Sequence, residues 1–292
     1  MSATPHRQRL CLPEAPSIPQ CNADAPMLKS LRRLFASEPA RATAAIPPGE
    51  RVYAVGDIHG RLDLFAEMIA AIERDDSVRG SARSTVILLG DLVDRGPDSA
   101  GVVAAARSWQ QNRPVRIIAG NHEEMFLRAL RKEEVLRTFL RHGGRETLLS
   151  YPIPPQAYAE ADFAGVQDLM RTAIPLEDIA FMEGFEQMIA IGDYLFVHAG
   201  ILPEVPLDAQ RTTDLRWIRE PFLSFPGNHG YVVVHGHTIT EEPQVRPNRI
   251  GIDTGAFASG RLTALCLEGT ERWLIEARED EGVISAHTRS IA

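Results

Sequence analysis

Side chains that could bind metal ions gather in four short segments of this chain. They are residues 56–60 (GDIHG), 90–96 (GDLVDRG), 120–123 (GNHE) and 197–200 (VHAG). Carboxylate and amide oxygens with imidazole nitrogens, and no thiolate, form a donor set that suits manganese, iron or zinc. The pattern predicts a site for divalent transition-metal ions.

The first three segments each follow an apolar run, at residues 52–55, 85–89 and 115–119. Continuous apolar runs of this length are typical of strands buried on both faces, and open α/β sheets bind ligands beyond the carboxyl ends of such strands. We therefore expect the polar residues after these runs to meet in one crevice. The candidates are Asp57, His59, Asp91 and Asn121, with His198 and a histidine from residues 234–238 (VHGHT).

Each segment alone has an ordinary structural explanation. A Gly-Asp pair after a strand is most often a turn, and a strand histidine such as His198 is most often a core residue. Independent turns would not be expected to provide three such motifs in succession at adjacent strand ends. No CxxC spacing joins Cys11, Cys21 and Cys266, and the chain has no GxxxxGK loop for a nucleotide.

The elements that must position these residues alternate along the chain, which predicts an α/β fold. Residues 63–74 and 98–111 have helical periodicity between the predicted strands. Residues 122–183 are predicted to be a mostly helical insertion. Two hairpins follow, at residues 185–198 and 261–275, with a further strand at residues 231–235.

These elements divide the chain into three parts. Residues 1–47 are predicted to be an N-terminal extension, partly disordered, with a short amphipathic helix at residues 27–37. Residues 48–276 would form the catalytic domain, and residues 277–292 a C-terminal tail. One main domain is favoured because the candidate ligands spread over most of its length and must meet.

Composition excludes several functional classes. The 292 residues carry a net charge of −8, which argues against a nucleic-acid partner. No apolar run approaches the length of a membrane span, and the N-terminus lacks the apolar core of a signal peptide, so we expect a cytoplasmic protein without stable membrane insertion. The sequence carries no signal for its oligomeric state.

The motif series GDIHG, GDLVDRG, GNHE, VHAG and GHT, in this order over about residues 50–265, resembles the phosphoprotein phosphatases of bacteria and phages. These enzymes are a branch of the calcineurin-like metallophosphoesterases. The resemblance implies a four-layer α/β/β/α sandwich with a helical insertion. It also implies two divalent transition-metal ions, with Mn²⁺ first and Fe or Zn as alternatives.

The resemblance implies a role for each matching residue. Asp57 and His59 would bind the first metal, Asp91 would bridge, and Asn121, His198 and His237 would hold the second. His235 is the rival for the last position, but it lies within the apolar strand, whereas His237 follows Gly236 in the GHT pattern. His122 would be the proton donor to the leaving group, with Asp94 orienting it, and Arg95 and Arg219 would bind the phosphate together with Asn121 and His122. Arg216 is the alternative to Arg219 in the segment at residues 215–220.

The implied reaction is direct hydrolysis of phosphoserine, phosphothreonine or phosphotyrosine monoesters by a metal-bridging hydroxide. The substrate would be a phosphoprotein or a phosphorylated small molecule. The competing enzyme is a diadenosine tetraphosphate hydrolase, in which the position of Asp94 is usually a small residue and Asp usually replaces Glu123. A catalytically silent phosphopeptide binder is the alternative of another class.

Overall fold

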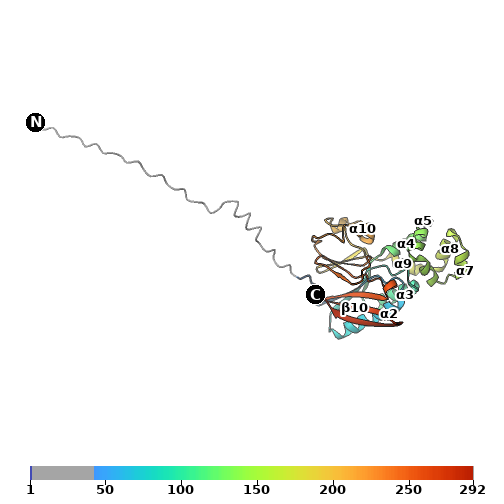
Figure 1. Cartoon of the computed structure of the whole chain (residues 1–292), viewed down its shortest axis with the longest axis horizontal. Coiled ribbons are helices and arrows are strands. Elements are labelled where there is room, and N and C mark those ends of the chain that lie inside the picture. Colours follow the sequence, from blue (N-terminus) through green and yellow to red (C-terminus); the bar gives the residue numbers. More distant parts are fainter. Residues whose placement is uncertain (2–42, 292) are drawn as a thin grey trace. The chain divides into compact units, whose positions relative to one another are not determined.

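The computed structural model describes Met1 and residues 43–291 of the chain (Figure 1). The chain separates into two units, residues 1–42 and 43–292, and the described helices and strands belong to the second. The helix predicted at residues 27–37 and most of the N-terminal extension therefore lie outside the described residues. Packing into the domain begins before residue 48, because Ile46 is buried.

A mixed six-stranded sheet forms one half of the domain, in the order β11-β10-β9-β1-β2-β3. Strands β1, β2 and β3 are parallel, as the alternation of strands and helices predicts, and β9 pairs with β1 in the antiparallel direction. The bounds are β1 Glu50–Val55, β2 Arg83–Leu88, β3 Val115–Ile117, β9 Arg261–Glu268, β10 Glu271–Asp280 and β11 Val283–Ser290.

A five-stranded sheet forms the other half, in the order β4-β5-β6-β8-β7. The predicted hairpin around Gly192 is present, because β4 and β5 pair in the antiparallel direction. Strands β5, β6 and β8 are parallel, so their carboxyl ends share one edge. The bounds are β4 Met188–Ile191, β5 Tyr194–Val197, β6 Val232–His235, β7 Gln244–Val245 and β8 Arg249–Gly251.

The two sheets pack face to face, and strand alternation shows this directly. In β1, Val52 and Ala54 belong to the core between the sheets, whereas Tyr53 and Val55 belong to the core beneath the helices. In β5, Leu195 and Val197 face a third core built by the segment around α10. The order of layers is thus helix, sheet, sheet, helix, which confirms the predicted α/β/β/α sandwich.

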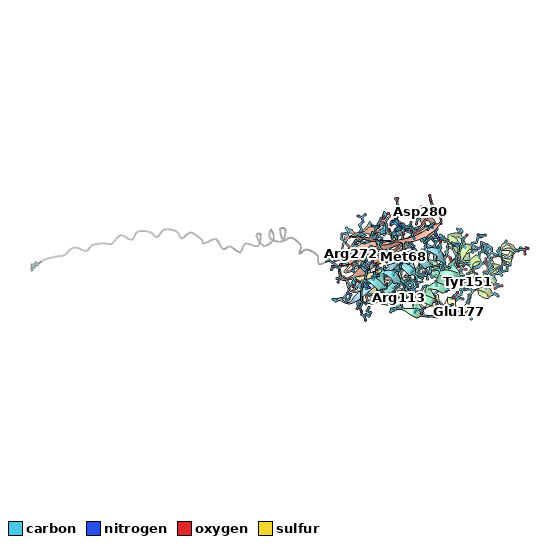
Figure 2. All side chains as sticks on the ribbon, turned by 90° about the horizontal axis from the view of Figure 1, so that it is seen from below. Met68, Arg113, Tyr151, Glu177, Arg272 and Asp280 are labelled. Atoms are coloured by element: carbon cyan, nitrogen blue, oxygen red, sulfur yellow. The ribbon has the colours of Figure 1, made fainter. Side chains whose placement is uncertain are left out.

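Two helices cover the outer face of the six-stranded sheet. Helix α2 (Leu62–Val78) buries Leu64, Phe65, Met68 and Ile72 at helical spacing. Helix α3 (Ser99–Asn112) begins where the Asp98 side chain accepts a hydrogen bond from the Gly101 amide. Figure 1 shows α2 beside β10, and Met68 of α2 is labelled in Figure 2.

The segment predicted as a helical insertion is helical, and its members gather on one side of the domain in Figure 1. Tyr151 and Glu177, both labelled in Figure 2, belong to this region. Its elements are α4 Asn121–Ala129, α5 Glu133–Phe139, η1 Leu140–Gly144, α6 Arg145–Ser150, α7 Pro155–Glu160, α8 Phe163–Ala173 and α9 Leu176–Glu183. The remaining helices are η2 Leu207–Ala209, α10 Thr212–Trp217 and α11 Ala256–Ser259.

The prediction of a C-terminal tail at residues 277–292 is wrong, because residues 277–290 complete β10 and form β11. Strand β11 is an edge strand with mostly exposed or half-buried residues, so it lacks the apolar pattern by which the other strands can be recognised. Its Arg289 makes an ion pair with the buried Glu276 of β10. Among the described residues, no helix is long and apolar enough to span a membrane.

Candidate metal centre

The candidate ligands meet where strands of both sheets end. Asp57 follows β1, Asp91 follows β2 and Asn121 opens α4 after β3, while His198 follows β5 and His237 follows β6. All of these side chains and His59 are buried, with exposed fractions of 8% or less. The structure therefore brings these strand ends, from both sheets, together at one place.

Asp91 lies at the centre of this cluster. Its Oδ2 atom is 3.6 Å from Nε2 of His59, 3.9 Å from Nε2 of His122 and 3.5 Å from Nε2 of His198. Asp91 thus belongs to both sets of residues whose ligand atoms lie within 4.8 Å of one another. We name these the first group (His59, Asp91, His122) and the second group (Asp91, His198, His237).

Left-handed backbone brings the first group together. His59 has φ of 47° and Asp91 has φ of 51°, values that side chains larger than glycine rarely adopt. The ring of His59 is oriented by a 2.8 Å hydrogen bond between its Nδ1 and the carbonyl of Val93, which leaves Nε2 directed at Asp91. Burial lowers the pKa of His59 to about 3, so the ring is neutral and its nitrogen lone pair is available.

The second group is arranged around the Asn121 amide. Its Oδ1 lies 3.0 Å from Nε2 of His198 and 2.8 Å from Nδ1 of His237. His198 is fixed by a 2.8 Å contact from its Nδ1 to the carbonyl of Leu89 in the neighbouring sheet. Burial lowers the pKa of His237 to about 3, which also keeps this imidazole neutral.

Asp57 lies between the two sheets and accepts hydrogen bonds from the His237 amide at 3.1 and 3.2 Å. Its burial, together with the neighbouring carboxylates Asp253 and Asp91, raises the pKa of Asp57 well above its ordinary value. Burial, together with the charge of Asp91, raises the pKa of Asp253 to about 6. Buried carboxylates this close to one another need a compensating positive charge.

The residues present therefore fit a pair of divalent cations. The cluster supplies buried carboxylates, neutral imidazoles and an amide oxygen, and no thiolate. Mn, Fe and Zn bind to donor sets of this kind. In addition, Nε2 of His237 is buried and has no hydrogen-bond partner in the described part of the chain. Cations would neutralise the carboxylates and give this nitrogen a partner.

Asp94 forms a pair with His122, a member of the first group. Nδ1 of His122 lies 2.6 Å from Oδ2 of Asp94, and both side chains are buried. Burial alone would lower the pKa of His122, but Asp91 and the hydrogen bond to Asp94 outweigh it and raise the pKa above its usual value. Because Asp94 holds Nδ1, the Nε2 atom is the one that faces the site.

The two predicted phosphate-binding arginines lie beside different groups of the cluster. Arg95 contacts Nε2 of His59 and Nε2 of His122, both at 2.9 Å, and its guanidinium lies over the Phe257 ring. Arg219 is exposed and reaches the carbonyl of His237 at 3.5 Å. Arg216, the alternative to Arg219 in sequence, contacts Glu124 at 3.4 Å instead.

Glu123 is a further member of the site, and the sequence motifs assigned it no role there. Its carboxylate accepts hydrogen bonds from the backbone amides of Asp91, Leu92, Val93 and Gly120 at 2.7 to 3.3 Å. These contacts tie the loop after β2 to the start of α4. Burial and the nearby Asp91 raise the pKa of Glu123 to about 7. Its place in the GNHE segment marked the position as part of a motif, but did not indicate that its carboxylate would bind backbone amides.

The helical insertion also reaches the site. Thr147 of α6 donates to Oδ1 of Asp94 at 2.6 Å and accepts from the Asp94 amide at 2.8 Å. The amide of Arg95 donates to the carbonyl of Gly143 at 3.1 Å, where φ of Gly143 is 102° and a β-carbon would lie 2.5 Å from the Arg95 nitrogen. The insertion therefore positions the loop that carries Asp94 and Arg95, which no sequence pattern indicated.

His235 stays outside both groups. It is buried within β6, its Nδ1 faces the carbonyl of Gly236 at 3.0 Å, and its Nε2 faces Arg249 at 3.4 Å. His237, with φ of 61°, is the histidine that turns toward Asn121. Of the two histidines that the sequence offered here, the structure brings His237 to the cluster.

The chain is similar in sequence to known phosphoesterases. The sequence profile of the calcineurin-like phosphoesterase family matches residues 50–288. Serine/threonine-protein phosphatase 1 of Salmonella typhimurium is 30% identical over 221 residues, which cover 73% of this chain and 89% of that protein. The asymmetrical bis(5'-nucleosyl)-tetraphosphatase PrpE of Bacillus velezensis is 25% identical over 260 residues, covering 78% of this chain and 97% of that protein.

Solved structures share the fold at low sequence identity. A crystal structure assigned to a diadenosine tetraphosphatase has a TM-score of 0.54 at 22% identity and covers 84% of this chain and 98% of that one. A mutant cold-active protein tyrosine phosphatase has a TM-score of 0.50 at 18% identity, covering 88% and 86%. With a profile match over most of its length and a 30% identical relative, this chain belongs to the calcineurin-like phosphoesterase family.

Proposed function

We propose that the chain is a metal-dependent phosphoprotein phosphatase, which hydrolyses monoesters of phosphoserine and phosphothreonine and also of phosphotyrosine. The observation that carries this proposal is the 2.6 Å hydrogen bond between His122, a member of the first group, and Asp94. A serine or threonine alkoxide is a poor leaving group and must receive a proton as its bond to phosphorus breaks. An imidazole held by a buried carboxylate supplies such a proton.

The proposed roles of the other residues follow from where they lie. Asp57, His59 and Asp91 would hold one cation, and Asp91, Asn121, His198 and His237 the other. When bound, two such cations lower the pKa of water and stabilise charge on the phosphoryl oxygens; Mn²⁺ is the first choice. Arg95 and Arg219 would bind phosphate oxygens from two sides, because a guanidinium donates hydrogen bonds in a planar fork.

A second candidate is hydrolysis of dinucleotide polyphosphates. It is supported by the names of relatives, since bis(5'-nucleosyl)-tetraphosphatases of Bacillus velezensis and Methylobacillus flagellatus each align over most of their length. By name, the comparisons favour this candidate over the first. A nucleoside polyphosphate leaves with little help from an acid, so the His122–Asp94 pair supports the first candidate more.

The two candidates are separated by a direct comparison of substrates. We would measure catalytic efficiency on a phosphoserine peptide, a phosphotyrosine peptide and diadenosine tetraphosphate, with Mn²⁺ and with a chelator. Higher efficiency on the peptides supports a protein phosphatase, and higher efficiency on the dinucleotide supports the second candidate. Folded protein without metal-dependent turnover of any of them would contradict both and favour a phosphopeptide binder.

A further inference from the structure

Trp217 is a large aromatic side chain left partly exposed beside the candidate metal centre. It ends helix α10, and 37% of its surface is accessible. Its ring lies 6.4 Å from the ring of His237, a member of the second group, at an interplanar angle of 75°. An exposed indole next to a buried cluster of ligands suggests a contact surface for whatever the cluster binds.

The indole is held in place rather than left free to turn. Its Nε1 donates to Oε2 of Glu124 at 3.2 Å. The Glu124 carboxylate is in turn held by Arg128 at 2.9 Å and by Arg216 at 3.4 Å. Leu215 and Ile218, on either side in sequence, are buried in the core of the α10 layer and fix the backbone. A fixed aromatic ring loses little conformational entropy when a ligand packs on it.

A second aromatic ring at the site has a different environment. Phe257 lies 5.5 Å from the His59 ring, and the Arg95 guanidinium lies 4.7 Å from its centroid. Phe257 is half-buried and already has Arg95 over its face, so it is less available to a ligand. Of these two rings, Trp217 is the one whose surface is open.

We propose that Trp217 is a specificity-determining residue that stacks on a planar aromatic group attached to the phosphate ester. This inference rests on the proposed function in one respect, namely that a phosphate ester binds at the two groups. Phosphoserine offers no such ring, whereas a nucleotide and phosphotyrosine do. Trp217 would therefore direct the site toward esters that carry a nucleobase or a phenol.

The test uses ligand pairs that share the phosphate and differ in the ring. Adenosine 5'-monophosphate and ribose 5-phosphate have the same sugar and phosphate, and only the first carries a base. Their inhibition constants would be measured against hydrolysis of a phosphoserine peptide. The intact protein should prefer the nucleotide by about tenfold, since stacking of a base on an aromatic side chain contributes a factor of this order.

The Trp217→Leu substitution keeps an apolar side chain and removes the aromatic surface, so the tenfold preference for the nucleotide should disappear. Trp217→Phe should keep part of it. Phe163→Leu is the matched control, because Phe163 is 38% exposed on α8 and should leave the preference unchanged. A preference that survives Trp217→Leu in folded protein would overturn the proposal.

Phosphotyrosine and phosphoserine, as free amino acids, form a second pair that identifies the source of the ring. If Trp217→Leu removes the preference in the nucleotide pair alone, the group that stacks on Trp217 is a nucleobase. If it removes the preference in the phosphotyrosine pair alone, the group is a phenol. Either result supports the stacking role.

A binding measurement keeps the test independent of turnover. Trp109 and Trp273 are buried, so quenching of tryptophan fluorescence by a ring-bearing ligand would report on Trp217. Adenosine 5'-monophosphate should quench, and ribose 5-phosphate should not. Quenching without turnover of the phosphoserine peptide would support this inference and contradict the proposed function. Turnover without quenching or preference would contradict this inference and support the proposed function.

Discussion

The two groups of the candidate metal centre are positioned by different parts of the structure. The first group lies beside a loop in which left-handed backbone continues past the ligands, since Asp94 and Arg95 have positive φ as well as His59 and Asp91. The second group also has left-handed members, Asp91 and His237, but His198 directly follows β5 and is anchored to the carbonyl of Leu89. Loop residues in unfavourable backbone regions keep their conformation only when surrounding contacts hold them.

Those surrounding contacts are concentrated at the first group. Glu123 binds the amides of the loop after β2, and Thr147 binds both the amide and the carboxylate of Asp94. Fewer side chains hold the second group, where Asp57 accepts from the His237 amide and the carbonyl of Leu89 contacts His198. We therefore expect the first group to be more sensitive to substitutions outside the ligands themselves.

The largest effect is expected where the groups overlap. Asp91→Asn removes the carboxylate shared by both, so bound Mn²⁺ and hydrolysis of an aryl phosphate should fall together, by about 10³-fold in activity, since even an outer-shell residue costs 10- to 100-fold. Elemental analysis and a chromogenic assay measure the two quantities. Asp168→Asn is the control, because this side chain is 75% exposed on α8. Retention of both metal and activity would contradict a shared role.

Next in size is a loss confined to the first group. His122→Asn should lower kcat on phosphoserine peptide by about 10²-fold, within the usual range for general acid catalysis. The loss on an aryl phosphate should be much smaller, because a phenolate with an electron-withdrawing group leaves without a proton. Parallel rate measurements on the two substrates check this. Equal losses would count against proton donation by His122.

A smaller effect is expected from the contact that holds the loop. Glu123→Gln replaces an oxygen acceptor of backbone amides by an NH₂ group, so the free energy of unfolding should fall by about 3 kcal/mol. Urea denaturation measures it. Glu183→Gln, on the exposed end of α9, is a suitable control. If Glu123→Gln has wild-type stability, the loop of the first group does not depend on Glu123.

The smallest effect is expected away from both groups, at Glu276 in β10. Burial raises the pKa of Glu276, but hydrogen bonds from Arg289 and Arg278 and the charge of Arg261 outweigh it, so the net shift is downward. A carboxylate with a lowered pKa stabilises the fold above its unfolded pKa of about 4.3 and loses this contribution as pH falls through the folded value.

Glu276→Gln should therefore reduce the free energy of unfolding by about 1 kcal/mol near pH 7, because the partner arginines are partly exposed. The difference from wild type should shrink below about pH 4. Unfolding curves at several pH values measure it, and activity at neutral pH should not change. A difference that grows on acidification would contradict the assigned direction.

The sequence predicted the parts of this structure that follow from local pattern. The apolar runs before Asp57, Asp91 and Asn121 are strands or lead directly from them, and the helical periodicity of residues 63–74 lies within α2. The hairpin near Gly269 is also present. Strand β11 was missed because its edge position needs no apolar face, and β8 was missed because three residues are too short for a periodic signal.

The sequence by itself determined which residue types stand at the strand ends, and so which chemistry the crevice can perform. Only the tertiary structure decided that Asp91 faces both groups, that Glu123 and Thr147 hold the loop between them, and that Trp217 remains exposed beside His237. The physical reason is that ligand identity is a local property of the chain, whereas these contacts join residues tens of positions apart. Such contacts form only once the sheets have packed.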